Sequence, residues 1–320
     1  MNAITQQIES LRPSRERPSP WSVPKVLLSN EPDGLGSEVA TTTIFLTGAE
    51  CPFRCTMCDL WQYTSTANTP IGAIPFQLSQ ALPTGVTDTR QWLKLYNASN
   101  FFDHRSIPKQ DLKAISSYCV PFERVIVENH PMLCDDRMQG FADTLPGKLE
   151  VAMGLETIHP IAMLAMNKGM KLDDFDRAVE QCHRMAIDVR VFVLLHPPGI
   201  PLAESVEWTC RTIAYALERN VRHVSIIPVR AGNGWIEKLI ALGQYQLPTI
   251  GLLRQFIAAF RNGIRPPRGT VIEFDMWDWQ QIAGGCTQCK AILGDRIAHY
   301  NRTLDFLQLV EAEIGCECFV

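Results

Sequence analysis

Short runs of apolar and β-branched residues recur along the chain from about residue 40 onward, with polar loops between them. Most positions in these runs are apolar, which is typical of strands buried on both faces of a sheet. The clearest runs are at 42–48, 92–97, 124–129, 149–156, 190–196 and 223–229, with a weaker one at 270–277. We therefore expect six strands, and a weaker seventh, in one covered sheet.

Segments with the period of amphipathic helices lie between the apolar runs. In 171–187, apolar side chains recur every three or four residues and acidic residues come early, as a helix N-terminus prefers. The segment 203–219 has the same period, and we expect its Trp208 and Cys210 to pack in the core. Strands that alternate with helices predict a parallel sheet, and we predict an α/β fold: a partial (β/α)6 barrel of the TIM type.

The 320 residues are compatible with a single α/β core, to which we assign three parts. Residues 1–39 form an N-terminal arm, 40–235 the barrel core, and 236–320 a C-terminal extension that completes or caps the barrel. The arm contains "RPSRERPSP", whose Pro, Ser and clustered charges predict an extended surface segment.

Overall composition narrows the possible functions. The chain has 46% hydrophobic and 20% charged residues, without an apolar run of about 18 residues that could span a bilayer. The N-terminus lacks the apolar segment of a secretory signal, so we expect a cytoplasmic protein, in which eleven cysteines suggest metal binding rather than a disulfide framework. The net charge of −4 gives no support for nucleic-acid binding, although a local basic patch stays possible.

Unusual polar stretches follow each predicted strand. Because reactive groups of parallel βα folds gather at the C-terminal ends of the strands, these stretches are expected to share one rim. Any single one is explained by the ordinary polarity of loops, but six together favour a site. The stretches are at 51–58, 97–103, 128–131, 156–160, 196–199 and 230–234.

Three cysteines, Cys51, Cys55 and Cys58, follow the first strand with the spacing C-x3-C-x2-C. At this cysteine content such a triplet is expected by chance only about 0.01 times. Three thiolates on one loop can bind three corners of a cubane iron–sulfur cluster and leave the fourth iron open to a small ligand. A structural zinc site would need a fourth ligand, for which His104 or Cys134 is possible but not local.

Together with these cysteines, several stretches of the chain resemble the radical S-adenosylmethionine superfamily. These stretches are "KLYNASNFFD", "IVENHP", "VAMGLETIHP", "LAMNKGM", "FVLLHPP" and "IIPVRAGNGWIE". They are similar to its branch with the archaeosine synthase radical enzyme and, more distantly, the catalytic subunit of Elongator. The resemblance implies a [4Fe-4S] cluster on Cys51, Cys55 and Cys58. It also implies S-adenosylmethionine on the open iron, an electron donor such as flavodoxin or ferredoxin, and a 5′-deoxyadenosyl radical that removes hydrogen from a substrate.

The resemblance also assigns roles to two side chains after the second strand. Asn97 and Ser99 stand where the family binds the amino group of S-adenosylmethionine. The chain departs from the family at Asn100 and Phe101, where small residues are more common.

Four further residues are implied to contact the cofactor. Glu156 matches the position that contacts the ribose hydroxyls, with a helix-start carboxylate as the alternative. Glu128 ends the third strand, where a rim salt bridge is the alternative. Arg230 and Asn233 lie between glycines that let backbone approach the adenine or the substrate.

A second metal site, for zinc or another iron–sulfur cluster, is possible near the C-terminus. Its candidate ligands form two pairs that lie far apart in the sequence, and a chance C-x2-C pair is common at this cysteine content. The candidates are Cys286, Cys289, Cys316 and Cys318.

Resemblance alone indicates the substrate, which would be a modified nucleoside in tRNA. The alternatives are radical modification of a small metabolite or peptide and, outside catalysis, an iron–sulfur sensor of iron or redox state. A tRNA enzyme with this net charge must concentrate its cations. Those available are Arg12, Arg15, Arg17, Arg261, Arg265 and Arg268.

Overall fold

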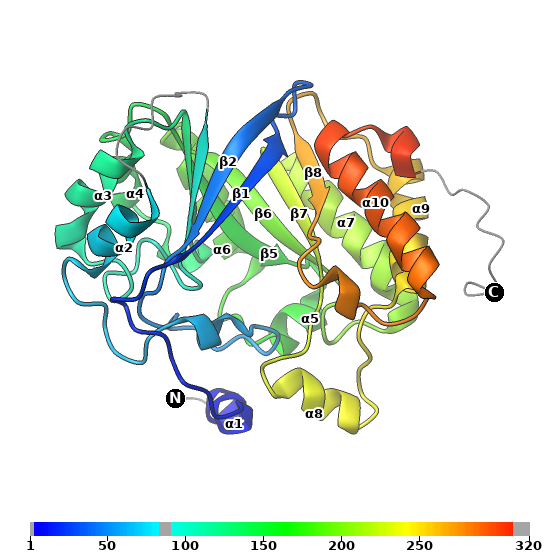
Figure 1. Ribbon diagram of the computed structural model, residues 1–320. Coiled ribbons are helices and arrows are strands. Elements are labelled where there is room, and N and C mark those ends of the chain that lie inside the picture. Colours follow the sequence, from blue (N-terminus) through cyan, green and yellow to red (C-terminus); the bar gives the residue numbers. More distant parts are fainter. Residues whose placement is uncertain (1–2, 83–90, 310–320) are drawn as a thin grey trace.

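An eight-stranded sheet curls into an open half-barrel in the computed structural model, which describes residues 3–82 and 91–309 (Figure 1). Strands that are neighbours in the sequence are neighbours in the sheet. The strands are β1 (Lys25–Pro32), β2 (Glu38–Phe45), β3 (Trp92–Tyr96), β4 (Arg124–Glu128), β5 (Lys148–Glu156), β6 (Asp188–Leu195), β7 (His223–Pro228) and β8 (Val271–Phe274).

The seven predicted strands correspond to β2 through β8, and all are parallel. The predicted partial barrel of the TIM type is therefore confirmed. The sequence reading missed β1, which pairs antiparallel with β2. Because β1 belongs to the arm, the arm is part of the main sheet, and the expected boundary at residue 39 falls inside β2.

Helices cover the convex side of the sheet (Figure 1). Apolar side chains of the strands, such as Ile44, Leu95, Val127 and Val191, are fully buried against them and form the main core. The predicted helices at 171–187 and 203–219 are present as α6 and α7. The covering helices are α2 (Ala73–Ala81), α3 (Leu112–Cys119), α4 (Arg137–Ala142), α6 (Leu172–Arg184), α7 (Ser205–Glu218), α9 (Ile250–Gly263) and α10 (Thr287–Thr303).

Three other helices lie at the C-terminal ends of the parallel strands, along the lower edge of Figure 1. These are α1 (Ala3–Leu11), α5 (Pro160–Ala165) and α8 (Trp235–Ala241). The same edge carries the loop after β2. We call this edge, with the loops that follow β2 to β8, the C-terminal rim. None of the described helices is long and apolar enough to cross a bilayer.

The concave side of the sheet contains charged side chains instead of a purely apolar filling. Arg190 on β6 is 1% exposed, and its Nε lies 2.7 Å from Oε1 of Glu150 on β5. Its Nη2 lies 2.8 Å from Oε2 of Glu31 on β1, which also pairs with Lys94 on β3. These contacts join four strands across the barrel. A buried network of charges therefore occupies this part of the concave side.

Candidate cofactor site at the C-terminal rim

The cysteine loop is fastened to two other segments of the rim. The backbone N–H of Thr56 donates to the carbonyl of Met166 at 2.9 Å, and its hydroxyl donates to the carbonyl of Ala165 at 3.2 Å. The Thr56 carbonyl accepts from the side-chain amide of Asn233. The loop between Cys55 and Cys58 is thus held by the segment after α5 and by the loop before α8.

The three thiols are half-buried on this loop. Burial raises the pKa of each thiol, that of Cys55 to about 12, whereas the charges of Lys168 and Arg54 act in the opposite direction on Cys51 and Cys55. Binding of iron would displace the thiol protons, as metal binding to cysteine does in general.

The described residues contain no group of three or more His, Cys, Asp or Glu side chains arranged around a single metal ion. A structural zinc site draws four ligands around one point. In a cubane cluster each thiolate binds a different iron, so three ligands on one loop suffice. The donor set of three thiolates with the cationic neighbours Lys168 and Arg54 fits such a cluster.

The loop after β3 presents polar atoms that lack partners. Asn97 is fully buried, and its Nδ2 donates to the Ser106 hydroxyl at 3.0 Å, but its Oδ1 has no hydrogen-bond partner in the described structure. The hydroxyl of Ser99 is buried and equally unpaired there. Buried polar groups normally find partners, so these two atoms are suited to a polar ligand such as an amino group.

Glu128 fixes the backbone of that same loop. Its Oε2 accepts from the backbone N–H groups of Asn97 at 3.0 Å and Ala98 at 3.2 Å. Burial raises the pKa of Glu128 to about 7, although these two hydrogen bonds lower it. Ala98 has a φ of 51°, a left-handed conformation that the two bonds help to hold. The geometry thus gives Glu128 a positioning role, which the sequence did not indicate.

Glu156 is paired with a lysine that sequence reasoning did not select. Its Oε1 lies 2.5 Å from Nζ of Lys168, which is 6% exposed. Burial lowers the pKa of Lys168, but Glu156, together with Cys55 and Cys58, outweighs this and raises it. Gly154 leaves the space for this pair, because a methyl group there would overlap both charged ends.

The loop after β7 holds the last two predicted residues. Oδ1 of Asn233 accepts from the N–H groups of Trp235 at 3.0 Å and Ile236 at 3.1 Å, which caps α8. With its bond to Thr56, the Asn233 amide is used inside the protein, and the geometry favours a structural role over a cofactor contact. Arg230 lies on the rim, with Nη1 3.6 Å from Asp275 and 3.5 Å from Asp278.

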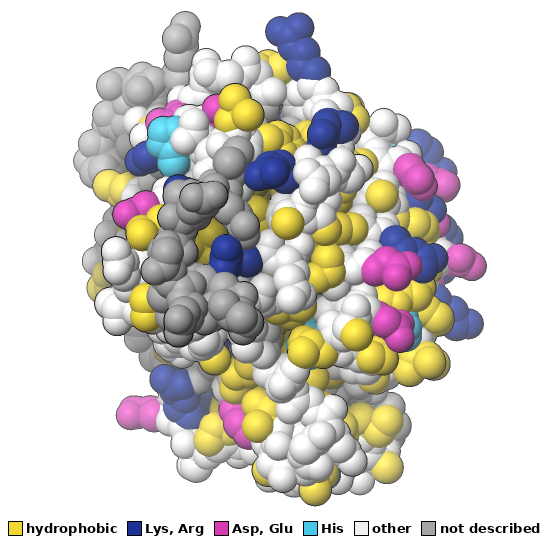
Figure 2. All heavy atoms as spheres, turned by 90° about the vertical axis from the view of Figure 1, so that its right-hand side faces the viewer, with side chains coloured by type: hydrophobic (Ala, Val, Ile, Leu, Met, Phe, Trp, Pro, Cys, Tyr) yellow, Lys and Arg dark blue, Asp and Glu magenta, His cyan; other side chains and the backbone are white. Residues whose placement is uncertain are grey.

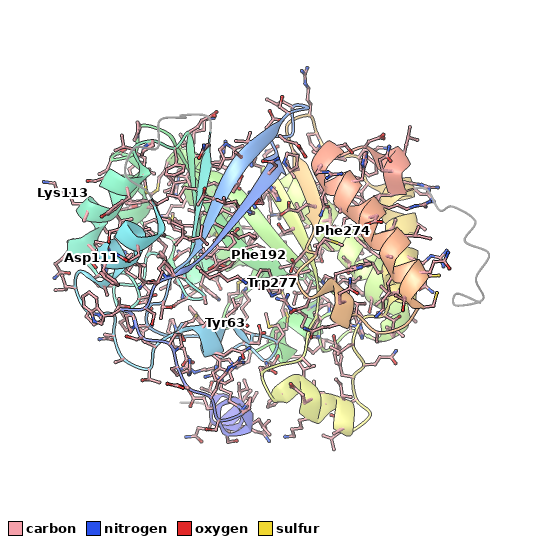
Figure 3. The ribbon with its side chains drawn as sticks, viewed as in Figure 1. Tyr63, Asp111, Lys113, Phe192, Phe274 and Trp277 are labelled. Carbon is pink, nitrogen blue, oxygen red and sulfur yellow. The ribbon has the colours of Figure 1, made fainter. Side chains whose placement is uncertain are left out.

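Aromatic side chains from separate elements lie between the sheet and the rim. Figure 3 shows Phe192 of β6, Trp277 after β8 and Tyr63 at successive levels toward the rim. Trp277 also packs on Phe45 at the end of β2, with ring centroids 5.8 Å apart. Flat apolar faces at this edge are suited to stacking against a ring of a ligand.

The arm is fastened to the cysteine loop by its arginines. Glu50, which precedes Cys51, accepts from Arg12 at 2.7 Å and from Arg17 at 2.8 Å. Both guanidinium groups lie over the Trp61 ring, and Arg15 donates to Gln62. Arg12 and Arg17 are thus used in ion pairs within the protein, whereas the side chain of Arg15 is exposed.

The second arginine group lies at the other end of the barrel, at the end of α9 and in the loop that leads into β8. Arg265 donates there to the carbonyls of Arg261 and Ile264. Gly269, next to Arg268, donates to the carbonyl of Gly34 in the arm at 3.2 Å, but Arg12, Arg15 and Arg17 lie at the opposite end of the strands, so the fold does not bring the two arginine groups together. Figure 2 shows Lys and Arg spread singly among apolar and acidic side chains on the side formed by α7, α9 and α10.

Two other features lie away from the rim site. A cavity of about 980 Å³ opens at the N-terminal ends of the strands, but its Arg124 and Arg222 are already paired with Glu150 at 2.9 and 3.0 Å.

Two cysteines of the candidate second metal site lie at the start of α10, where Cys286 is exposed and Cys289 is buried. Its other two cysteines, at 316 and 318, lie outside the described residues.

Comparisons with known proteins found similar sequences and one similar fold. No family model matches the chain. Archaeosine synthase subunit beta of Methanosarcina acetivorans is 26% identical over 94% of this chain and 89% of its own length. The protein of the same name from Thermococcus kodakarensis is 26% identical over 36% of this chain and 37% of its own.

A solved structure shares the fold. Elp3 of Methanocaldococcus infernus, with residues 1–46 deleted, superposes with a TM-score of 0.50 at 15% identity. The match covers 67% of this chain and 54% of that structure, so the chain spans about half of its length.

Proposed function

We propose that this chain, an enzyme related to archaeosine synthase subunit beta and to other radical S-adenosylmethionine enzymes, binds a [4Fe-4S] cluster through Cys51, Cys55 and Cys58. S-adenosylmethionine would bind beside it on the C-terminal rim. With the cluster bound, one-electron reduction cleaves S-adenosylmethionine to methionine and a 5′-deoxyadenosyl radical, which removes a hydrogen atom from the substrate. The observation that carries the proposal is that the loop with the unpaired Asn97 and Ser99 atoms contacts the cysteine triplet, where Nδ2 of Asn100 lies 3.1 Å from Sγ of Cys51.

The chain's own residues divide the binding task. Asn97 Oδ1 and the Ser99 hydroxyl would accept from the amino group of S-adenosylmethionine, on a loop that Glu128 holds in place. The free oxygen of Glu156 would accept from a ribose hydroxyl, while Lys168 fixes the orientation of its carboxylate. Arg230, in the loop after β7 and paired with Asp275 and Asp278, would contact the adenine or the substrate.

We expect Glu156→Ala to weaken S-adenosylmethionine binding and to leave the cluster intact. Hydrogen bonds to a charged group contribute about 1.5–3 kcal/mol, which corresponds to roughly a ten- to hundredfold higher Kd. Calorimetric titration of the reconstituted protein measures this change. Lys168→Met is the matched variant, because it breaks the same ion pair but keeps the carboxylate. If the Kd for S-adenosylmethionine does not change in Glu156→Ala, the Glu156 carboxylate has no role in binding it and serves only to pair with Lys168.

For the substrate we favour a modified nucleoside in tRNA, because relatives that match most or part of the chain are named archaeosine synthase subunit beta. Because Arg12 and Arg17 pair with Glu50, tRNA binding would rely on the exposed Arg15, on other cations or on a partner protein. A low-potential donor such as flavodoxin or ferredoxin would supply the electron.

Comparison of tRNA nucleosides from cells with and without the gene tests this assignment. We expect one modified nucleoside to disappear from digested tRNA and its precursor to accumulate. An unchanged nucleoside profile with an altered small metabolite or peptide would contradict the tRNA assignment and favour the alternative substrates. The mass spectrometric comparison covers both pools from the same cultures.

A further inference from the structure

We propose that Asn100 tunes the reduction potential of the cluster by donating a hydrogen bond to the sulfur of Cys51. This inference rests on the proposed cluster site and concerns a residue at which the chain departs from the radical S-adenosylmethionine pattern. The side chain is 2% exposed, and its Nδ2 lies 3.1 Å from Sγ of Cys51. No other side-chain donor to a sulfur of the triplet is found among the described residues.

The direction of the Asn100 amide is fixed by its second contact. Its oxygen lies 2.7 Å from the backbone nitrogen of His130, a group that can only donate. The oxygen must therefore face His130, which leaves the –NH₂ group to face the sulfur. The amide cannot turn over without placing two donors against each other.

The surroundings of Asn100 keep it in this position. The backbone beside it is held as well, because the N–H of the next residue, Phe101, donates to the Glu128 carbonyl at 2.8 Å. The ring of His130 is stacked on Phe53 of the cysteine loop, with ring centroids 3.7 Å apart. The loop after β3, the loop after β4 and the cysteine loop are thus joined around one buried amide.

A donor to a cluster thiolate favours the reduced state. Reduction adds negative charge that is shared by the sulfur ligands, and a hydrogen bond to sulfur becomes stronger as that charge grows. In a buried position the bond faces little competition from water. Asn100 therefore raises the potential and makes the cluster easier for a one-electron donor to reduce.

The chain offers a matched control in the neighbouring loop. Asn129 is also buried, its Oδ1 accepts from the N–H of Phe102 at 3.2 Å, and its Nδ2 lies 3.5 Å from Sγ of Cys134. Cys134 is not part of the triplet. The same substitution at Asn129 thus changes an amide–thiol contact without touching a cluster ligand.

The test is a potentiometric titration of anaerobically reconstituted holoprotein, followed by the electron paramagnetic resonance signal of the reduced cluster. Asn100→Asp keeps the acceptor for His130 and replaces the donor to Cys51 by a carboxylate oxygen. We expect at least a tenfold fall in the reduction equilibrium constant, about 59 mV for a one-electron couple. Asn100→Ala should lower the potential by less, and Asn129→Asp should leave it at the parent value.

The possible failures are distinguishable. If the parent assembles no four-iron cluster, the proposed function fails and this inference with it. If the parent assembles one but both Asn100 variants keep its potential, only the role of Asn100 is overturned. An equal shift in Asn129→Asp would also overturn it, since the effect would then come from a general disturbance of the loops. Should Asn100→Asp not fold, Asn100→Ala decides.

Discussion

Replacing Cys51, Cys55 and Cys58 together by alanine is expected to abolish the visible absorption of the reconstituted protein and all cleavage of S-adenosylmethionine. The three side chains are the proposed protein ligands of the cluster, and the described structure provides no alternative set of cysteines next to the unpaired Asn97 and Ser99. The loss of the cluster is measured from the sulfur-to-iron charge-transfer absorption and from the iron and sulfide content. Cys134→Ala/Cys210→Ala is the control, because both thiols lie outside the triplet.

Full retention of iron and sulfide in the triple variant would contradict the assignment of the triplet. A residual fraction has a separate meaning, because the four C-terminal cysteines could hold a second cluster. In that case the remaining iron should disappear when Cys286 and Cys289 are also replaced. Zinc bound there would survive in the triple variant as zinc.

The second large effect is expected from Arg190→Met, far from the cysteines. Removing this guanidinium takes away a buried partner of the Glu31 and Glu150 carboxylates. Arg190 is 1% exposed, and its nitrogens lie 2.7 Å from Glu150 and 2.8 Å from Glu31. Breaking one side of a buried ion pair costs about 3–5 kcal/mol of unfolding free energy. Urea unfolding of the metal-free protein measures the change.

The matched control for this variant is Arg211→Met on the surface of α7. Arg211 pairs with Glu207 at 3.5 Å, and both side chains are exposed. Exposed pairs contribute about 0–1 kcal/mol, so this variant should unfold close to the parent. Equal losses in the two variants would show that the remaining partners, Lys94 for Glu31 and Arg124 and Arg222 for Glu150, suffice and that Arg190 does not hold the strands together.

The sequence predicted the parallel sheet because its strands are apolar on both faces, and this signal needs no tertiary information. It missed β1, whose apolar part is limited to Val26, Leu27 and Leu28 between polar residues. That strand is partly exposed at the edge of the sheet, so it lacks the pattern of a buried strand. The charges inside the barrel were visible as Lys94, Glu150 and Arg190 within apolar runs, but their pairing depends on the curvature of the sheet.

The site was predictable to a different extent for each residue. Cys51, Cys55 and Cys58 are adjacent in sequence, so their spacing alone indicates shared chemistry. The resemblance to the archaeosine synthase branch, which relatives of that name confirm, supplied Asn97, Ser99 and Glu156. Their cofactor contacts stay predictions.

The partners of these residues could not be read from the sequence. Lys168 meets Glu156 only because the segment after α5 folds back onto β5. Asn100 meets Cys51 across 49 positions of the chain. The arm arginines likewise find Glu50 only once α1 lies on the rim. Contacts of this kind arise from tertiary structure, and a single sequence does not contain a local signal for them.

We propose that the rim site uses its cluster for catalysis rather than for sensing. The most direct measurement is the conversion of S-adenosylmethionine by the anaerobically reconstituted, reduced protein. We predict that 5′-deoxyadenosine and methionine form in equal amounts, slowly without substrate, and only when both reductant and cluster are present. A protein that holds a complete, reducible cluster yet leaves S-adenosylmethionine intact would contradict the account and favour an iron–sulfur sensor.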